Sequence, residues 1–212
     1  MSSSAGIIII GDEILSGRTK DTNINWIANE LNEIGIKLKE ARVIEDDKKT
    51  IINTVLEFSK KFTYVFTSGG IGPTHDDITT ESIATAFKVD LEKNKIAMNL
   101  LKKHYEKSNI DFNEARQKMA IIPKGASLID NPVSVAPGFN IKNVFVFAGV
   151  PKIMQSMFHS ISINLQGGTI IKSKTITCDI GEGKIANALG QIEKQFLNMK
   201  IGSYPYFNPQ SF

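Results

Sequence analysis

The sequence predicts an α/β domain, with a mainly parallel sheet covered by helices on both faces, followed by a small α+β module. The apolar run Ala5–Ile10 is rich in β-branched residues, which is typical of a strand buried on both faces. Strand patterns then alternate with helix patterns, as right-handed crossovers between parallel strands require. The 212 residues, 42% of them hydrophobic, provide enough material for one such core and an appendage.

The first part of the chain is expected to form three strands separated by two helices. Asp21 or Thr22 can cap the first helix, whose apolar residues keep helical spacing until Gly35 ends it. The second helix directs Ile51 and Val55 inward. The expected strands span residues 5–10, 38–44 and 64–67, and the expected helices span 22–34 and 50–60.

Helical patterns dominate the middle of the chain, before one more buried strand. The spacing of Ile83, Ala84 and Phe87 predicts a helix over 79–87, and we expect the next two helices to form the far side of a cleft. The remaining elements are expected as helices over 94–106 and 113–120, a strand over 144–147 and a helix over 152–163.

A second pattern begins after the glycine pair Gly167-Gly168, so the expected division is 1–166 and 167–212. The second part predicts a strand over 169–177, a helix over 184–197 and a strand over 201–204. Its roughly 45 residues are marginal for independent stability, so we expect them to dock on the main domain or on a partner subunit. Whether this module is complete at Phe212 stays open.

Composition argues against several classes of protein. The net charge is +3 and the basic residues are scattered, so no nucleic-acid surface is expected. One cysteine and three histidines exclude an internal disulfide and a Cys/His zinc cluster, which favours a reducing compartment. The start of the chain lacks the basic residues of a signal peptide, and its apolar run is too short to cross a bilayer. We therefore expect a cytoplasmic protein without membrane contact.

The loop that follows the third strand, Ser68-Gly69-Gly70-Ile71-Gly72-Pro73-Thr74, is the first candidate site. Ligands of parallel sheets bind at the carboxyl ends of the strands. Glycine lets backbone N–H groups approach a phosphate, and the loop leads into a helix. Glycine-rich turns also occur without ligands, so the glycines alone leave both interpretations open.

Carboxylates beside this loop suggest a metal ion. Asp76 and Asp77 would repel an anionic ligand unless a cation such as Mg²⁺ bridged carboxylate and phosphate oxygens. Asp12 and Glu13 follow the first strand and reach the same sheet edge. As alternatives, Asp77 caps the next helix, and Asp12 and Glu13 are merely solvated.

Other loops at this edge carry weaker signals. In residues 131–139 the prolines restrict the backbone, while Ser134 stays available for hydrogen bonding and Pro137 for a pocket wall. Gly149 precedes a helix as a second possible anion site. On the residues alone, an ordinary proline-containing turn is the favoured interpretation of 131–139.

Taken together, these motifs resemble one family in order. They are similar to the molybdopterin-binding (MoaB/Mog-like) domain, and within it to CinA and FAD synthase domains. The similar segments are Gly11 to Gly17, Asp21-Thr22-Asn23, residues 67–77, Asn131-Pro132 with 136–139, and 149–151. The resemblance implies a three-layer α/β/α fold and a homo-oligomer, a dimer or trimer. It also implies metal-dependent hydrolysis of the pyrophosphate in FAD or ADP-ribose.

Two functional hypotheses follow. The preferred one is a nucleotide pyrophosphatase that uses Mg²⁺, Mn²⁺ or Co²⁺, and the alternative is a non-catalytic nucleotide- or molybdopterin-binding protein. In the first, Asp76 and Asp77 are catalytic, and together with Asp12 and Glu13 they are the candidate metal ligands. The expected ligand-binding residues are Gly11, Ser16, Ser68, Gly69, Gly70, Gly72, Thr74, Ser134, Pro137 and Gly149.

Overall fold

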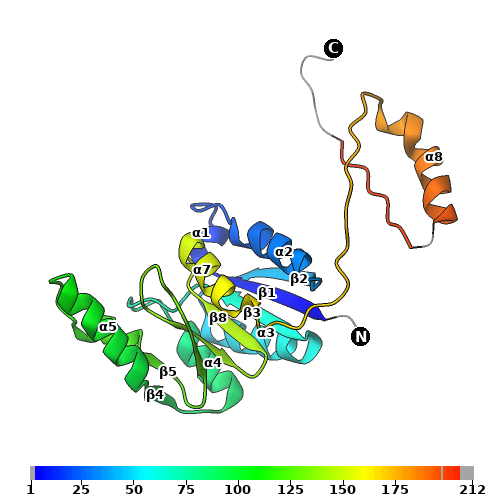
Figure 1. Cartoon of the computed structure of the whole chain (residues 1–212). Helices are drawn as coiled ribbons and strands as arrows, with labels where there is room; N and C mark the ends of the chain where they lie inside the picture. The colour runs from blue at the N-terminus through cyan, green and yellow to red at the C-terminus, as the bar shows by residue number, and fades with distance from the viewer. Residues whose placement is uncertain (1–2, 197, 206–212) are drawn as a thin grey trace. The chain divides into compact units, whose positions relative to one another are not determined.

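The apolar run near the start of the chain forms strand β1 (Ser4–Ile10), which is buried from Ala5 onward. The structure is a computed structural model that describes residues 3–196 and 198–205. The chain divides into two units, Met1–Ile171 and Lys172–Phe212 (Figure 1). Each unit is described by itself below.

The main unit is built on a six-stranded sheet with the order β2-β1-β3-β8-β7-β6. The first four strands in this order are parallel, whereas β7 runs antiparallel to both of its neighbours. The prediction of a mainly parallel sheet is therefore confirmed. The strands other than β1 are β2 (Lys37–Ile44), β3 (Tyr64–Ser68), β6 (Ser127–Ile129), β7 (Gly138–Ile141) and β8 (Val144–Phe147).

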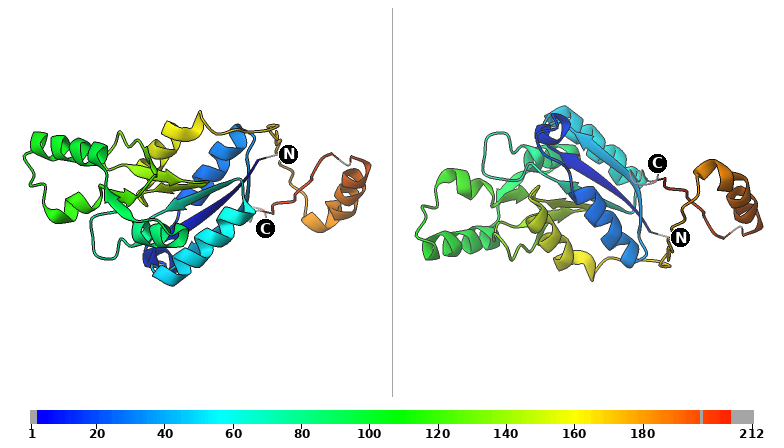
Figure 2. Two further views of the ribbon diagram at one scale, coloured as in Figure 1. Left: turned by 90° about the horizontal axis from the view of Figure 1, so that it is seen from below. Right: turned by 90° about the horizontal axis from the view of Figure 1, so that it is seen from above.

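Helices cover both faces of this sheet and make three layers (Figures 1 and 2). Ile7 and Ile9 pack into a core with α2 and α7, while Ile8 and Ile10 pack into a second core with α3 and α4. Successive strand residues point to opposite faces, which explains the unbroken apolar run. The covering helices are α2 (Asn23–Glu33), α3 (Lys48–Lys61), α4 (Thr79–Phe87) and α7 (Pro151–Ser162).

Local capping agrees with the sequence at α2. The carboxylate of Asp21 accepts hydrogen bonds from the backbone N–H groups of Asn23 and Ile24, at 3.3 and 3.0 Å. After the helix, Gly35 has φ +72°, a left-handed conformation that glycine adopts without steric cost. These two residues fix where α2 begins and ends.

An excursion between β3 and β8 forms a separate small lobe, seen beyond α4 in Figure 1. The hairpin of β4 (Leu91–Lys93) and β5 (Ile121–Pro123) carries α5 (Lys95–Lys107) and α6 (Glu114–Lys118). The helices were predicted from the sequence. The strands β4 to β6 were not, because three residues are too few to establish a two-residue period. Strand β7 was not predicted either, since it begins inside the segment 131–139 that was expected to be a loop.

The second unit confirms one predicted helix and corrects two predicted strands. Helix α8 spans Glu182–Gln195, whereas residues 169–177 and 201–204 form no strand in the part of the chain that is described. A strand needs a hydrogen-bonded neighbour, and none of the described segments pairs with them. Leu197, the expected end of the helix, lies outside the described residues.

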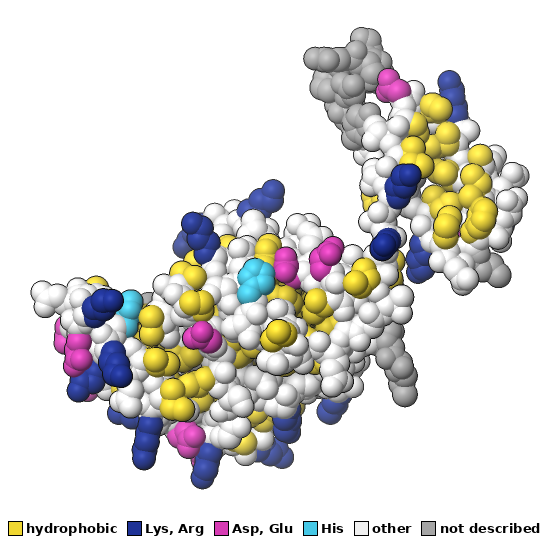
Figure 3. Space-filling model, in the orientation of Figure 1, with side chains coloured by type: hydrophobic (Ala, Val, Ile, Leu, Met, Phe, Trp, Pro, Cys, Tyr) yellow, Lys and Arg dark blue, Asp and Glu magenta, His cyan; other side chains and the backbone are white. Residues whose placement is uncertain are grey.

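Apolar side chains of the second unit are on its surface, where Figure 3 shows them as a yellow cluster. Helix α8 has no buried residue, and Ile176 is 80% exposed. By contrast, Gly168 at the end of the main unit donates its N–H to the Gly35 carbonyl at 3.1 Å, so this residue packs with the main unit. No described helix is long and apolar enough to span a membrane.

Candidate functional site

The carboxyl ends of β1, β3 and β8 meet around Gly69. Its N–H donates to the Phe147 carbonyl of β8 at 3.1 Å, and a Cβ placed on Gly149 would lie 3.4 Å from the Gly69 Cα. On the other side, a Cβ on Gly69 would come within 2.1 Å of the Ile10 carbonyl oxygen of β1. The topology thus brings together three loops that are far apart in the sequence.

Glycine is required at two successive positions of the loop after β3. Gly69 has φ +115° and Gly70 has φ +69°. A Cβ on Gly70 would lie 2.1 Å from the Thr79 hydroxyl, and the Thr79 N–H donates to the Gly70 carbonyl at 3.0 Å. The loop is therefore held against the first turn of α4 with its backbone unobstructed by side chains.

Asn23, at the start of α2, ties two of these loops together. Its side-chain amide donates to the Ser68 hydroxyl and to the Gly149 carbonyl, each at 2.9 Å. Asn23 is only 5% exposed, and its Oδ1 accepts no hydrogen bond in the described structure. Asn23 was part of a sequence motif but had no predicted role, because its partners lie 45 and 126 residues away.

Asp77 organises the turn at Pro73 to Asp77. One oxygen of its carboxylate accepts hydrogen bonds from the Thr74 backbone N–H, at 2.8 Å, and from the Thr74 hydroxyl. The residue that caps α4 is Ile78, which has no side-chain capping bond, so the alternative that Asp77 caps this helix is wrong. Asp77 closes its own loop instead.

Lys118, from α6, holds the same turn from the other side. Its ammonium group donates to the carbonyl oxygens of Thr74 and Asp77, at 2.7 and 2.9 Å. This role could not be predicted from the sequence, because Lys118 is the last residue of a five-residue helix in a different lobe. The lobe and the loop after β3 are thus joined at the candidate site.

A pair of acidic residues joins the ends of β1 and β2. The Asp12 N–H donates to the Asp46 carboxylate at 3.0 Å, and the Asp46 N–H donates to the Asp12 carboxylate at 3.3 Å. Asp46 was missed because Glu45-Asp46-Asp47 precedes a helix, where acidic residues are common as caps. Asp47 does cap α3, accepting from the Thr50 N–H at 2.8 Å.

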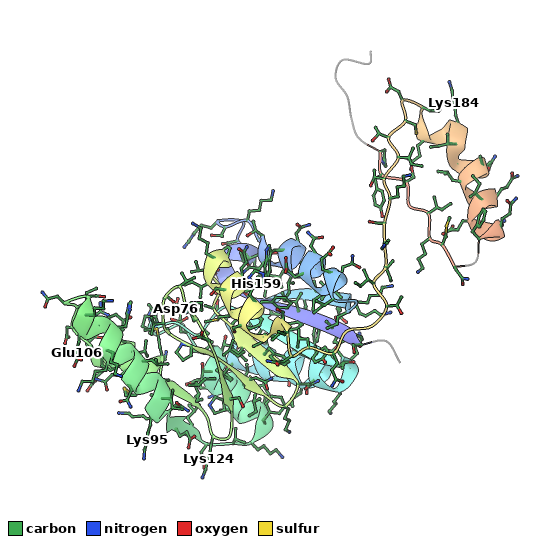
Figure 4. All side chains as sticks on the ribbon, in the orientation of Figure 1. Asp76, Lys95, Glu106, Lys124, His159 and Lys184 are labelled. Carbon is green, nitrogen blue, oxygen red and sulfur yellow. The ribbon has the colours of Figure 1, made fainter. Side chains whose placement is uncertain are left out.

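Negative charge concentrates around Asp46. Burial raises the pKa of its carboxyl group, and the charges of Asp12, Glu13 and Asp76 raise it further, while a hydrogen bond from the Asp12 backbone opposes them. Figure 4 labels Asp76, on the loop after β3. The ends of β1, β2 and β3 therefore contribute acidic side chains that interact with one another.

Replacing Asp46 by asparagine is expected to stabilise the metal-free protein at neutral pH. A raised pKa means that the ionised Asp46 carboxylate lowers the stability of the folded state. This loss of stability appears as the pH rises from the ordinary pKa of an aspartate, ~3.9, through the higher pKa of Asp46 in the folded protein. The gain should be roughly 1–2 °C in Tm at pH 7 and should shrink below pH ~4. Thermal unfolding across this pH range measures it, and a gain independent of pH would contradict the assignment.

The acidic groups supply oxygen donors of the kind that Mg²⁺ and Mn²⁺ prefer. As the side chains stand, however, no three of the described His, Cys, Asp and Glu residues are placed together to hold a metal ion. One oxygen of Asp77 is engaged by Thr74. Asp12, Glu13 and Asp76 are exposed, so their side chains have room to turn toward a shared ion.

Two predicted ligand-binding residues are engaged locally. The Ser16 hydroxyl donates to the Glu13 carbonyl at 3.3 Å, within its own turn. Ser134 accepts from the buried Asn131 side chain at 2.6 Å. Asn131 also donates to the Ala136 carbonyl at 2.7 Å and thereby shapes the loop after β6. Neither serine hydrogen-bonds to the loop after β3 in the described structure.

Pro137, by contrast, does line a cavity next to the loop after β3, as predicted for a wall residue. It lines a cavity of about 200 Å³ together with Gly72, Asp77 and Lys118. Three residues predicted from two distant segments, Gly72 and Asp77 from the loop after β3 and Pro137 from residues 131–139, thus face one space. Gly11, another predicted ligand-binding residue, is buried. Its N–H donates to the Ile44 carbonyl of β2 at 3.1 Å.

Comparison with known proteins finds two family matches. Residues 6–166 match the family described as "Probable molybdopterin binding domain", and residues 171–212 match "FAD synthase, middle domain". A protein from Archaeoglobus fulgidus is 35% identical over 199 residues, which cover 94% of this chain and 84% of the relative. A protein from Sulfurisphaera tokodaii is 39% identical over 161 residues, but these cover 74% of this chain and only 61% of the relative.

Solved structures show the same similarity. The protein CinA, of unknown function, from Thermoplasma acidophilum is 34% identical and superposes with a TM-score of 0.71, covering 77% of this chain and 98% of its own. The molybdopterin biosynthesis enzyme MoaB from Thermus thermophilus is 15% identical, with a TM-score of 0.52, and covers 77% of this chain and 91% of its own. At that identity MoaB shares the fold alone.

Proposed function

The chain belongs to the "Probable molybdopterin binding domain" family, and from this premise we propose that it is a metal-dependent pyrophosphatase of FAD or ADP-ribose-like dinucleotides. Membership agrees with the resemblance seen in the motifs and supports a nucleotide- or pterin-binding role. The observation that carries the finer proposal is the meeting of a glycine loop with interacting carboxylates at one sheet edge. The match of residues 171–212 makes FAD the first substrate to test.

The phosphate would bind to the loop after β3. The Gly69 N–H is used by the Phe147 carbonyl, but the N–H groups of Gly70, Ile71 and Gly72 donate no hydrogen bond within the described chain. Consecutive free N–H groups in a glycine turn form an anion-binding concavity. The available donors are therefore Gly70 to Gly72 rather than the whole segment from Ser68.

Asp12, Glu13 and Asp76, with the second oxygen of Asp77, would hold a divalent ion such as Mg²⁺, Mn²⁺ or Co²⁺. When bound, such an ion neutralises the pyrophosphate charge and lowers the pKa of a bound water. Without it these carboxylates would repel the substrate, since Asp76 is 68% exposed and belongs to the same loop as the proposed phosphate donors. The donor chemistry fits a hard cation.

Asp46 is the proposed proton acceptor. One of its oxygens is held by the Asp12 N–H at 3.0 Å, which leaves the other free to accept a proton from the attacking water. The water oxygen forms a bond to one phosphorus, the bond from that phosphorus to the bridging oxygen breaks, and the bridging oxygen leaves with the second phosphate. The products are two monophosphates, AMP and FMN in the case of FAD.

A second candidate function is binding without turnover. The observation that favours it is that no three acidic or histidine side chains of the described chain are already placed as a metal-ligand set. The alternative keeps the glycine loop as a nucleotide or pterin site and gives the carboxylates no catalytic role. Only the fate of the bound ligand separates the two.

The deciding experiment is a panel of FAD, ADP-ribose and a pterin, each with Mg²⁺, Mn²⁺ or Co²⁺, analysed by product mass. The proposal expects AMP to appear only with protein and metal together. Binding by calorimetry without any product at any metal concentration would establish the binding role instead. Light scattering on the same samples tests the expected dimer or trimer.

Lys118→Met is expected to weaken FAD binding about 10-fold, because the two hydrogen bonds that hold the turn at Thr74 and Asp77 are lost. Lys118→Arg keeps a charged donor and should recover part of the affinity. Calorimetry measures the dissociation constants, and thermal unfolding checks that both variants fold. Equal affinity in the methionine variant and the natural protein would show that this contact does not shape the site.

A further inference from the structure

A cavity of about 200 Å³ lies beside the glycine loop, between that loop, α4 and the β4–β5 hairpin. Resting on the proposed function, we propose that this cavity binds the two-ring heterocycle, a purine or a pterin, of the ligand whose phosphate occupies the loop. Three of its lining residues, Gly72, Asp77 and Pro137, had been predicted as site residues from the sequence. Five of its twelve lining residues come from the lobe of the β4–β5 hairpin: Leu91, Lys118, Met119, Ile121 and Ile122.

The size and walls of the cavity suit a flat apolar ring. At ~30 Å³ per water molecule, its volume corresponds to six or seven waters, close to the space that a two-ring heterocycle occupies and too little for a whole dinucleotide. Ile71, Leu91, Met119, Ile121 and Phe139 line it. Sites for small cofactors are typically apolar with a few polar groups that fix orientation.

Polar groups at the cavity could recognise ring nitrogens. The Glu81 carboxylate lines it and is 3.3 Å from the Lys48 ammonium, which leaves lone pairs to accept N–H groups. Purines and pterins both present such N–H donors on one edge. Lys118 also lines the cavity, and only two of the three N–H donors of its ammonium group are used by Thr74 and Asp77.

The cavity and the phosphate loop share Gly72. Gly72 contributes to both, since it lines the cavity and carries one of the free loop N–H groups. Gly72 has no side chain of its own, and the Asp77 carboxylate lies against it, 2.6 Å from where a Cβ on Gly72 would be, so this carboxylate lies where the two spaces meet. One ligand can therefore place its ring in the cavity and its phosphate on the loop.

Leu91→Trp and Thr80→Phe, which enlarge lining side chains from two different elements, β4 and α4, test this proposal. Leu91 is 41% exposed, so a larger side chain there has room to be tolerated. Leu100→Trp is the matched control, because Leu100 is 42% exposed on α5 and does not line the cavity. Calorimetry with AMP, neopterin and inorganic pyrophosphate measures binding to each folded variant, and FAD hydrolysis is followed in parallel.

We expect both filling variants to bind AMP or neopterin at least 10-fold more weakly, with pyrophosphate binding changed less than about 3-fold and Leu100→Trp like the natural protein. Which of the two ring ligands is lost identifies the ring that the cavity takes. Unchanged ring binding in both variants overturns the cavity assignment, and the proposed function stands if FAD is still hydrolysed. No hydrolysis by the natural protein, with ring binding still lost in the variants, overturns the pyrophosphatase proposal and supports the cavity.

Discussion

Replacing Asp76 by alanine is expected to lower the metal-dependent release of AMP from FAD by at least about 100-fold. Hydrogen bonding from the Thr74 side chain, its own backbone N–H and the nearby charges of His75 and Lys118 lower the pKa of Asp76, so this carboxylate is ionised at neutral pH. The backbone N–H of Thr74, by contrast, donates to Asp77, which closes the turn. Single-turnover assays with mass detection measure the loss.

Folding should be unaffected by this change, since Asp76 is 68% exposed and exposed substitutions usually alter stability by less than ~0.5 kcal/mol. Asp90→Ala is the matched control, because Asp90 is exposed in the lobe and its side chain makes no hydrogen bond in the described structure. It should leave AMP release unchanged. If the Asp76 variant released AMP at the same rate as the natural protein, Asp76 would have no role in catalysis, and this would hold irrespective of the roles of the other carboxylates.

Replacing Gly69 by alanine is expected to lower the Tm by roughly 10 °C or to prevent folding. The new Cβ would lie 2.1 Å from the Ile10 carbonyl oxygen, and φ is +115°, so the loop would have to move away from β1. Strain of this kind costs ~1–3 kcal/mol, and forced overpacking adds a similar amount. At ~2–4 °C per kcal/mol for a chain of this size, the combined effect gives the expected shift.

Gly17→Ala separates the steric clash from the cost of a positive φ. Gly17 has φ +73° but no atom within 4 Å of an added Cβ. Its replacement should therefore cost only ~1 kcal/mol, or about 2–4 °C. Differential scanning calorimetry of both variants compares the two costs. Equal shifts would mean that the backbone of the loop relaxes freely around Gly69, and that its approach to β1 is not required.

The parts of this fold that repeat a pattern over several residues were predictable. The apolar run of β1 and the helical spacing in α2, α3, α4 and α5 each extend over enough residues to establish a period. The strands of the inserted hairpin are too short for that. Residues 169–177 have a composition favourable for a strand but no described partner to pair with, so composition alone misled the prediction.

By itself, the sequence determined which residue types lie at the candidate site, because glycines and carboxylates follow buried strands whose carboxyl ends must share an edge. Only the tertiary structure decided what these residues contact. Asn23 reaches Ser68 and Gly149, Asp46 faces Asp12, and Lys118 closes the turn. Such contacts join residues between 34 and 126 positions apart, and no local pattern encodes which distant group a side chain will meet.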